Sequence, residues 1–385
     1  MNHSQHPHTA QTLSSDEAAR YSRHLLLPEV GLRGQLVLKS SRVLVVGAGG
    51  LGCPAALYLA AAGVGTLGII DADVVEISNL QRQILHTTQR IGQQKTDSAQ
   101  AHLQALNPAI TVEAHTTMLS RDNALEILSA YDVILDGTDN FATRYLVNDA
   151  AGLLGKPLVY GSVFRFTGQV SAFDAKRGGC YRCLYPTPPP AEFVPNCAEG
   201  GVLGVLPGII GTLQAAEALK IILGIGETLH RRLLLVDALT MQFSRLNTPH
   251  NPHCALCGKE PTITELQDYE AFCSPTQKPV FDVTAHEISA YEITAQELLH
   301  RKQEFIIIDV REAYERTISH IEGSEHIPLG EIAANMDRIA AFTRPVVFHC
   351  QSGKRSADAL RLAMEHGISA QHLRGGIMAW MQHVD

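Results

Sequence analysis

Three basic and polar residues downstream of a glycine-rich run could bind and split a nucleoside triphosphate. The run is GAGGLG at 47–52, directly after the apolar residues 43–46. Its glycines permit a tight turn, and the helix that follows presents its N-terminus to phosphate groups. Asn79, Arg82 and Lys95 add hydrogen-bond donors and positive charge that suit a triphosphate. The alternative function for such a turn is that of a nicotinamide-dependent dehydrogenase. A dehydrogenase has no use for this cluster, and the sequence contains no motif that would place its catalytic His or Tyr.

Four of the eight cysteines form two Cys-x-x-Cys pairs, Cys180 with Cys183 and Cys254 with Cys257. Each pair can chelate a metal through two thiolates on a tight turn, and together they fill the tetrahedral shell of a zinc ion. A redox-active Cys-x-x-Cys pair is the alternative. With all four positions taken by protein, no coordination site is left for water, so we expect a structural rather than a catalytic zinc ion.

Cys350 begins the sequence CQSGKRS at 350–356, which follows an apolar run and precedes a helical pattern. The backbone N–H groups of such a loop, the helix dipole and Arg355 would lower the pKa of the thiol and hold an anion. A tyrosine-phosphatase loop is the alternative, but it needs five residues between Cys and Arg, and only four separate Cys350 from Arg355. The smaller loop suits a persulfide sulfur better than a phosphate.

The remaining cysteines carry weaker signals. Cys197 follows a proline-rich stretch, residues 186–196, that we expect to be exposed and extended. A thiol on such a loop could reach an activated carboxyl group, and a thiol without a role is the alternative. Cys53 and Cys273 belong to no motif, and Cys53, on the first helix after the glycine run, is expected to pack in the core.

The elements that position these residues follow from alternating apolar runs and helical patterns, which are typical of a mainly parallel sheet with helices on both faces. Residues 201–226 approach the length of a transmembrane span, but Pro207, Glu217 and Lys220 interrupt them and favour a buried helix over 207–223. In the first half we expect strands at 42–46, 66–70, 110–114, 132–136 and 157–162, and helices at 52–62, 95–106, 122–130 and 142–154.

A second α/β pattern begins near Ile293, with buried strands expected at 305–309 and 345–349 and a helix at 355–366. Weak periodicity before it indicates a linker. The expected organisation is a flexible tail (1–14), a first α/β domain (15–258), a linker (259–292) and a smaller α/β domain (293–385).

Composition sets the class of protein. The 385 residues are 45% apolar and 18% charged, which is enough for two or three globular domains. A net charge of −8 argues against nucleic acid as a partner. The N-terminus has no apolar core of a secretory signal. Eight cysteines without such a signal favour a reducing compartment, where metal-binding or catalytic thiols are more expected than disulfides, so we expect a cytoplasmic protein with no membrane partner.

The joint pattern of the glycine run, Asp71, SNLQRQ at 78–83, Lys95 and TDN at 138–140 resembles the adenylation domain shared by ubiquitin-activating enzymes and their bacterial relatives. Those relatives adenylate small ubiquitin-like sulfur carriers. The resemblance runs from about Arg20 to Cys257 and implies a Rossmann-like, doubly wound fold. The nucleotide-binding residues that it implies are Gly50, Asp71, Ser78, Asn79, Leu80, Gln81, Arg82, Lys95, Asp139 and Asn140.

Individual roles follow from the same resemblance. Asp71 would accept the ribose hydroxyls, and a strand-end turn is its alternative role. Asp139 would hold Mg²⁺ against the phosphates, and its alternative role is an N-cap of the helix that begins near residue 141. Arg23, matched together with Arg20, would reach into the ATP site of the partner in a homodimer. Cys197 matches a position where relatives carry a cysteine that receives the carrier or resolves an intermediate.

Residues 293–385 resemble rhodanese sulfurtransferases through the Cys350 loop, DVRE at 309–312 and the segment from His320 to Leu329. The whole chain therefore resembles fused adenylyltransferase–sulfurtransferases. That resemblance implies ATP, Mg²⁺ and Zn²⁺ as cofactors, a carrier protein ending in Gly-Gly, and a cysteine desulfurase as sulfur donor. Cys350 persulfide would attack the carrier adenylate, and Arg355 and Cys197 would assist. Molybdenum cofactor biosynthesis is the expected pathway; thiamine biosynthesis, tRNA thiolation and a non-enzymatic docking scaffold are the alternatives.

Overall fold

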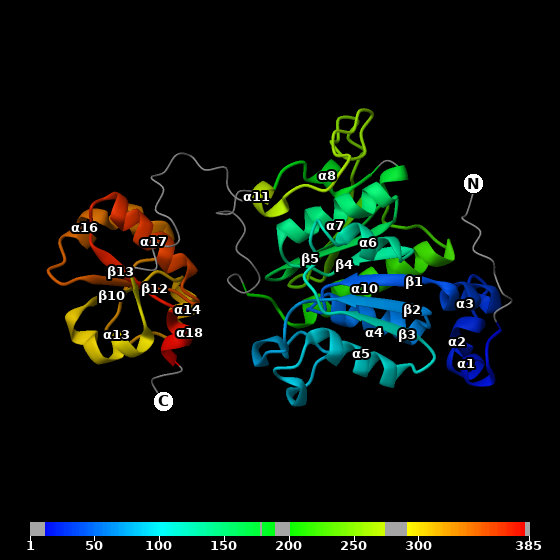
Figure 1. Ribbon diagram of the computed structural model, residues 1–385, viewed down its shortest axis with the longest axis horizontal. Helices are drawn as coiled ribbons and strands as arrows, with labels where there is room; N and C mark the ends of the chain where they lie inside the picture. The colour runs from blue at the N-terminus through cyan, green and yellow to red at the C-terminus, as the bar shows by residue number, and fades with distance from the viewer. Residues whose placement is uncertain (1–11, 178, 189–200, 274–290, 382–385) are drawn as a thin grey trace. The chain divides into compact units, whose positions relative to one another are not determined.

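The computed structural model describes residues 12–177, 179–188, 201–273 and 291–381 (Figure 1). The chain divides into two compact units, Met1–Pro275 and Thr276–Asp385. Each unit has its own sheet and its own buried core, so each is described by itself. The expected tail residues 1–11 and Cys197 lie outside the described residues.

The first unit is built on one eight-stranded sheet in the order β3-β2-β1-β4-β5-β6-β7-β8. Its first five strands in this order are parallel, and the last three pair antiparallel. Chain order reverses beside β1, which lies between β2 and β4. The strands are β1 (Arg42–Val46), β2 (Thr66–Ile70), β3 (Thr111–His115), β4 (Val133–Asp136), β5 (Leu158–Phe164), β6 (Thr167–Phe173), β7 (Arg232–Asp237) and β8 (Gln242–Asn247).

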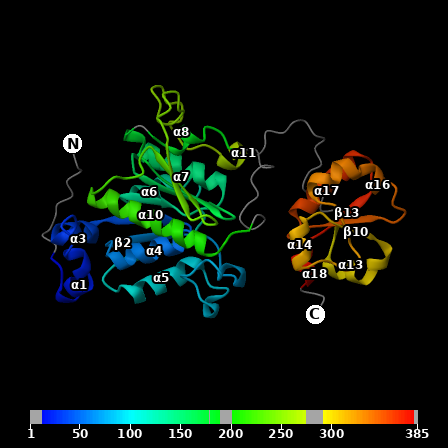
Figure 2. The same cartoon turned by 180° about the vertical axis from the view of Figure 1, so that it is seen from behind.

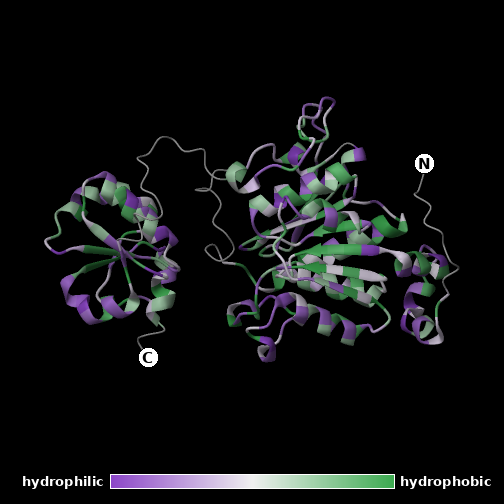
Figure 3. Cartoon of the chain, in the orientation of Figure 1, coloured by the Kyte–Doolittle hydropathy of each residue, from purple (hydrophilic) through white to green (hydrophobic). Residues whose placement is uncertain are grey.

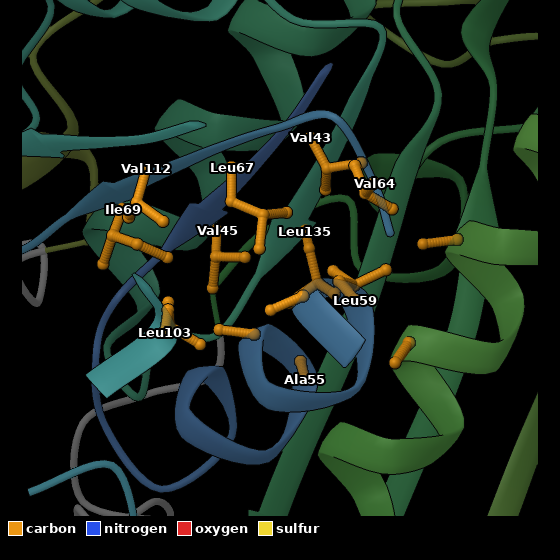
Figure 4. Close-up of a cluster of buried hydrophobic side chains, with 14 of the residues drawn as sticks. Val43, Val45, Ala55, Leu59, Val64, Leu67, Ile69, Leu103, Val112 and Leu135 are labelled. Atoms are coloured by element: carbon orange, nitrogen blue, oxygen red, sulfur yellow. The ribbon is translucent and has the colours of Figure 1, made fainter. Parts of the chain in front are cut away.

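Helices cover both faces of this sheet (Figures 1 and 2). One face carries α4 (Gly52–Ala62), α5 (Lys95–Leu106) and α10 (Val205–Leu223), and the other carries α6 (Ala124–Ser129), α7 (Phe141–Leu154) and α11 (Tyr269–Cys273). Because both faces are covered, successive residues of β1 are buried on opposite sides: Val43 and Val45 pack toward α4 (Figure 4), and Leu44 and Val46 toward α7.

The expected elements agree with the structure, with ends that differ by one or two residues. The strands β6, β7 and β8 were not expected. Before β1, the chain forms the short helices α1 (Ser15–Arg20) and α2 (Ser22–Leu25) and then α3 (Gly31–Ser40). Ser14 caps α1 in a reciprocal capping box with Glu17, so the first helix begins at Ser15.

The helix α10 confirms the expectation for residues 207–223. Within the described residues it is long and apolar enough to cross a membrane, by length and composition only. In the structure it packs on β5, β6 and α4, and Ile210 and Gln214 lie directly over the sheet. Figure 3 shows mainly apolar residues in the strands, whereas the helices that cover them carry both apolar and polar residues. The packing is that of a core helix.

The second unit contains a five-stranded parallel sheet in the order β11-β10-β12-β13-β9. The strands are β9 (Glu292–Ile293), β10 (Ile306–Asp309), β11 (Glu325–His326), β12 (Val346–His349) and β13 (Ala370–Leu373). Two apolar clusters cover its two faces. The helices are α13 (Ala295–Arg301), α14 (Ala313–Ile318), α15 (Leu329–Ile332), α16 (Met336–Ala340), α17 (Lys354–Glu365) and α18 (Gly376–Met381).

Two details concern particular sequence expectations. Residues 259–273, expected to begin the linker, instead belong to the first unit, because Tyr269 is buried in the core against α7. The buried aromatic side chain comes from a helix of a single turn, and a segment this short shows no helical periodicity in the sequence. Cys53 is fully buried as expected, and burial raises the pKa of its thiol to about 12.

Candidate functional site

The glycine-rich turn follows β1 at the carboxyl edge of the sheet, beside the place where chain order reverses. The Gly47 N–H donates to the Ile70 carbonyl at 2.8 Å, and the Gly137 N–H donates to the Val46 carbonyl at 2.8 Å. The ends of β2 and β4 are thereby joined to the turn. A Cβ at Gly52 would lie 1.8 Å from the Gly47 carbonyl oxygen, so only glycine fits there. Ligands of doubly wound sheets bind at this kind of crevice.

Asp71 lies beside the turn. Its Oδ2 accepts a hydrogen bond from the Ala48 N–H at 2.8 Å, and its Oδ1 accepts one from the Asp73 N–H at 2.8 Å. These hydrogen bonds are those of a strand-end turn, which was the alternative role expected for Asp71. Each oxygen can still accept a second hydrogen bond, so this arrangement is compatible with binding ribose hydroxyls as well.

Lys95 is the first residue of α5, and its side chain is 7% exposed. Its Nζ donates to Asp73 Oδ2 at 2.8 Å, whereas the Asp73 side chain is 72% exposed. Asp73 was not among the expected site residues. The signal available in the sequence was its position two residues after Asp71.

The SNLQRQ segment folds over the glycine turn. Residues Ile77–Asn79 form a single 3-10 turn in which buried Asn79 accepts from the Glu76 N–H at 3.1 Å. Arg82 Nη1 donates to the Ser78 carbonyl at 3.0 Å, and its Cδ would lie 3.6 Å from a Cβ placed at Gly50. Ser78 and Gln81 are exposed, and Leu80 is half-buried. The structure thus brings Arg82 and Gly50 together.

The segment after β4 presents Asp139 as an exposed residue next to the turn. The helix N-cap expected as its alternative role belongs instead to Asn140, whose Oδ1 accepts from the Thr143 N–H at 2.8 Å. Two further residues hold this segment. Buried Asp136 accepts from the Thr138 N–H at 2.9 Å and from its hydroxyl at 2.6 Å, and Arg144 donates to the Thr138 carbonyl at 3.0 Å.

Sequence analysis missed Asp136 and Arg144, which form a buried pair with Nε to Oδ2 at 3.6 Å. Burial raises the pKa of Asp136, and the charge of Arg144 opposes that rise. The signal available in the sequence was Asp136 itself, a charged residue at the end of an otherwise apolar strand.

Arg20 and Arg23 lie at the opposite edge of the same sheet. Arg20 Nη1 donates to the Leu106 carbonyl at the end of α5 at 2.9 Å, and neighbouring Tyr21 accepts from Asn107 Nδ2 at 2.8 Å. Both contacts are at the carboxyl end of a helix that runs back from the carboxyl edge of the sheet. Exposed Arg23, on α2, is therefore remote from the glycine turn of its own chain.

The four expected metal ligands form one cluster. The Sγ atoms of Cys180, Cys183, Cys254 and Cys257 all lie within 4.8 Å of one another, with separations of 3.4 to 4.0 Å among the closest pairs. Four thiolates bound to one zinc ion at 2.3 Å lie about 3.8 Å apart. Hydrogen bonds from the thiols of Cys180 and Cys257 lower the pKa of Cys254 and so favour its thiolate form. The cluster fits a tetrahedral zinc site.

The first cysteine turn is tied to the core through Arg182. Its guanidinium forms two 2.8 Å hydrogen bonds to buried Asp149 on α7, and the Tyr269 hydroxyl donates to the same carboxylate at 2.7 Å. The guanidinium also lies over the rings of Tyr145 and Phe272, 4.8 and 4.7 Å from their centroids. Charge pairing and ring stacking thus join the cysteine turn, α7 and α11.

In the second unit, Cys350 follows β12 and is 1% exposed. Its Sγ accepts a hydrogen bond from the Gly353 N–H at 3.1 Å. Gly353 has φ of 102°, a left-handed conformation that only glycine adopts readily, and it turns the loop into α17. The backbone of the loop therefore points an N–H donor at the sulfur, which is the arrangement expected for this loop.

A buried ion pair supports the loop. Arg311 binds Asp309 through Nε and Nη2 at 2.9 and 2.7 Å, and its Nη1 reaches Gln351 Oε1 at 3.3 Å. Burial opposes ionisation of Asp309, but the hydrogen bonds and charge of Arg311 outweigh it and lower the pKa of this carboxyl group. His349, fully buried, lies 3.7 Å from Asp309 Oδ2, and burial lowers the pKa of its ring to about 4.

Arg355 is in the expected loop but is paired with a residue that sequence analysis missed. Its Nη1 and Nη2 bind Glu315 Oε2 and Oε1, each at 2.7 Å. Glu315 lies on α14, 40 positions before Arg355, and no local pattern links the two. Part of the positive charge expected beside Cys350 is therefore offset.

Comparisons with known proteins agree with this geometry. The ThiF family model matches residues 21–256, and the model of the rhodanese-like domain matches residues 294–383. A Mycobacterium tuberculosis protein named "Probable adenylyltransferase/sulfurtransferase MoeZ" is 48% identical over 97% of this chain and 95% of its own length. The mouse protein named "Adenylyltransferase and sulfurtransferase MOCS3" is 44% identical over 97% of this chain and 87% of its own.

Two other comparisons concern the first unit. A Thermus thermophilus protein named "Sulfur carrier protein adenylyltransferase" is 56% identical over 68% of this chain and 98% of its own length. A crystal structure of Escherichia coli MccB with ATP matches 63% of this chain and 75% of its own, with a TM-score of 0.56 and 23% identity. The structural likeness supports the fold.

Proposed function

This chain belongs to the ThiF family and is an adenylyltransferase joined to a sulfurtransferase domain, and from that premise we propose that it converts the C-terminal glycine of a small ubiquitin-like sulfur-carrier protein into a thiocarboxylate. The observation that carries the proposal is the convergence of the glycine turn, Asp71, Arg82 and the segment before α7 at one edge of the sheet. The same chain holds a buried cysteine in a rhodanese-like loop.

The first step activates the carrier. Its terminal carboxylate attacks the α-phosphorus of ATP, pyrophosphate leaves, and an acyl-adenylate remains. Asn79, Arg82 and Lys95 hold the phosphates, and Asp71 holds the ribose; Ser78, Leu80, Gln81 and Asn140 complete the pocket. Adenylate is a good leaving group, so the carboxyl carbon becomes open to attack by a sulfur nucleophile.

Two metal ions fit the residues present. Exposed Asp139 offers a carboxylate oxygen of the kind that Mg²⁺ prefers, close to where the phosphates would lie. The cysteine cluster offers four thiolates at the spacing of a tetrahedral zinc site. Mg²⁺ would offset phosphate charge, and zinc would cross-link two turns 74 residues apart.

The second step transfers sulfur. The outer sulfur of Cys350 persulfide attacks the acyl carbon, AMP leaves, and the carrier is joined to Cys350 through an acyl disulfide. The Cys197 thiolate then attacks Cys350 Sγ, the S–S bond breaks, and the carrier leaves as a thiocarboxylate. The resulting Cys197–Cys350 disulfide requires two reducing equivalents from a cellular dithiol to restore both thiols.

The biological setting proposed is molybdenum cofactor biosynthesis in the cytoplasm, with a homodimer as the working unit and a cysteine desulfurase as sulfur source. The position of exposed Arg23, remote from the glycine turn of its own chain, is compatible with a role in the ATP site of a second chain. A carrier of thiamine biosynthesis or tRNA thiolation would undergo the same chemistry.

The test is a reconstitution with candidate carriers. Purified protein, Mg²⁺-ATP and a persulfide donor should release pyrophosphate only with a carrier ending in Gly-Gly, and mass spectrometry should find the carrier heavier by one sulfur-for-oxygen exchange. Carrier binding without pyrophosphate release would identify a docking scaffold instead.

A further inference from the structure

The buried side chain of His86 contacts the glycine-rich turn directly. Its Nε2 lies 2.9 Å from the carbonyl oxygen of Ala48, the second residue of the turn. A carbonyl oxygen can only accept a hydrogen bond, so Nε2 carries a hydrogen and donates it. His86 belongs to none of the motifs that indicated a phosphate-binding site, and no step of the proposed function involves it.

The other ring nitrogen of His86 fixes this protonation state. Nδ1 lies 2.9 Å from the hydroxyl oxygen of Ser98, which is fully buried on α5. Burial lowers the pKa of His86, so the ring is neutral at neutral pH and carries its one hydrogen on Nε2. Nδ1 therefore accepts from the Ser98 hydroxyl. The two hydrogen bonds hold the ring between the glycine turn and the helix that begins at Lys95.

Ala48 is held through both of its backbone polar groups. Its N–H donates to Asp71 Oδ2 at 2.8 Å, and its carbonyl accepts from His86. The Cys53 thiol also donates to this carbonyl, with Sγ 3.3 Å from the oxygen, and Sγ lies 3.8 Å from His86 Nε2. A thiol is a weak donor, so His86 supplies the stronger of the two hydrogen bonds to the carbonyl.

The direction of the Ala48 carbonyl decides where the next backbone N–H points. The peptide bond between Ala48 and Gly49 is planar and trans, so its C=O and N–H point in opposite directions. Because the carbonyl faces inward onto His86, the Gly49 N–H faces away from the core. Gly49 is half-buried, and within the described part of the chain no group accepts from its N–H. An unpartnered backbone donor in such a turn suits a phosphate oxygen.

We propose that His86 is a positioning residue for nucleotide binding: it holds the Ala48 carbonyl inward and thereby aims the Gly49 N–H at the phosphates of ATP. This inference rests on the adenylation half of the proposed function and adds a residue that acts through the backbone of the turn. His86 follows the SNLQRQ segment by three residues, and Ser98 follows Lys95 by three. One ring thus joins the three segments to which the proposed function assigns phosphate contacts.

The experiment compares two amide side chains at position 86 of the full-length protein. His86→Gln places its amide nitrogen near the position of Nε2 and keeps a donor for Ala48. His86→Asn is one methylene shorter and reaches only the position of Nδ1. The probe is the Mg²⁺ complex of α,β-methylene-ATP, which the enzyme cannot cleave between the α- and β-phosphates, and calorimetry gives its Kd. His86→Asn should bind the probe about tenfold more weakly than the wild type, as for the loss of one charge-assisted hydrogen bond, and His86→Gln should stay within about threefold.

His102→Leu is the matched control. His102 Nδ1 lies 3.0 Å from the carbonyl oxygen of Leu85, so this variant removes a histidine-to-carbonyl contact beside His86 and leaves the glycine turn untouched. It should bind the probe as the wild type does. Thermal unfolding followed by far-ultraviolet circular dichroism checks that each variant is folded at the temperature of the titration.

Ser98→Ala tests the same hydrogen bond without changing the ring. Loss of the hydroxyl removes the partner that selects the Nε2–H form of His86, and alanine keeps α5 helical. Binding of the probe should weaken by about threefold, less than in His86→Asn because part of the population keeps the hydrogen on Nε2.

The outcomes are distinct. Wild-type affinity in His86→Asn would overturn the role of His86. Equal losses in His86→Asn and His86→Gln, or an equal loss in His102→Leu, would also overturn it and would indicate only structural support. If neither variant at position 86 folds, wild-type affinity in Ser98→Ala overturns it in their place. A folded wild-type protein that does not bind the probe would instead overturn the proposed function.

Discussion

Arg182 and Asp149 form a buried, bidentate ion pair that links the first Cys-x-x-Cys turn to α7. Both partners are almost inaccessible, at 4% and 0% exposure. Removing one partner leaves the other charged and buried, at a cost of about 3–5 kcal/mol. The pair therefore couples the stability of the cysteine cluster to that of the sheet.

The first prediction follows from that pair. Arg182→Leu should lower the free energy of unfolding of the first unit by about 3–5 kcal/mol, measured by thermal unfolding with far-ultraviolet circular dichroism. Arg232→Ala, which removes a surface pair with the 75% exposed Glu227, should cost less than about 1 kcal/mol. Equal effects of the two variants would show that burial of the pair does not matter.

The second prediction concerns the cysteine cluster. Purified protein should contain one zinc ion per chain, and Cys254→Ser should lose it, because a neutral hydroxyl replaces a thiolate ligand. Structural zinc binding amounts to about 10–16 kcal/mol in small peptides, so the variant should be markedly less stable. Elemental analysis of the metal content checks this. Cys273→Ser, outside the cluster, is the matched control; folded wild-type protein free of zinc would refute the assignment.

The third prediction uses the two edges of the sheet. Asp139→Ala should abolish carrier-dependent ATP–pyrophosphate exchange with the fold intact, because Mg²⁺ loses its anchor. Arg23→Ala should also be inactive. Mixing the two variants should restore activity, since one of the two sites in a mixed dimer pairs an intact Arg23 with an intact Asp139. If mixing restores nothing, Arg23 does not act in a partner's site.

The fourth prediction separates the two chemical steps. Cys350→Ala should eliminate sulfur transfer and leave pyrophosphate exchange unchanged, because Cys350 lies in the other compact unit. Cys197→Ala should accumulate carrier joined to Cys350, visible on a non-reducing gel and released by reductant. Thiocarboxylate formation at the normal rate in Cys197→Ala, without added reductant, would show that Cys197 has no part in resolving the intermediate.

The fifth prediction concerns pH. His349 has a pKa of about 4 in the folded unit, because burial disfavours its charge, and about 6.5 when unfolded. As the pH falls, the unfolded chain binds a proton at His349 before the folded chain does. The free energy of unfolding therefore declines by about 3 kcal/mol in total as the pH falls from 6.5 toward 4. Urea titrations followed by Trp380 fluorescence should show this, with a shallower decline in His349→Gln. Buried His372, whose pKa burial also lowers, adds a residual slope in the same direction. An identical slope in both proteins would exclude His349.

Sequence patterns predicted the parallel half of the first sheet because strands buried on both faces read as continuous apolar runs. They did not predict β6 to β8, where Gln242–Asn247 is an edge strand with mostly exposed residues. The cysteine cluster was predictable because chelation imposes its own spacing. Ion-pair partners were not: Asp73 and Lys95 are 22 positions apart, and Glu315 and Arg355 are 40 apart. Such pairs depend on how elements pack, which local periodicity does not encode.

The helix α10 has a consequence for biosynthesis. Its main packing partners, α4, β5 and β6, all precede it along the chain. When this apolar segment leaves the ribosome, most of the surface that it covers has already been synthesised, and among the buried residues of the same cluster only Leu229 and Val236 are still to come. Gly161 and Gly168 leave room for Gln214 and Ile210 to pack closely on the strands. Vectorial synthesis therefore gives a segment of membrane-spanning character a place to dock as soon as it emerges, which limits its time in contact with chaperones, membranes and other nascent chains.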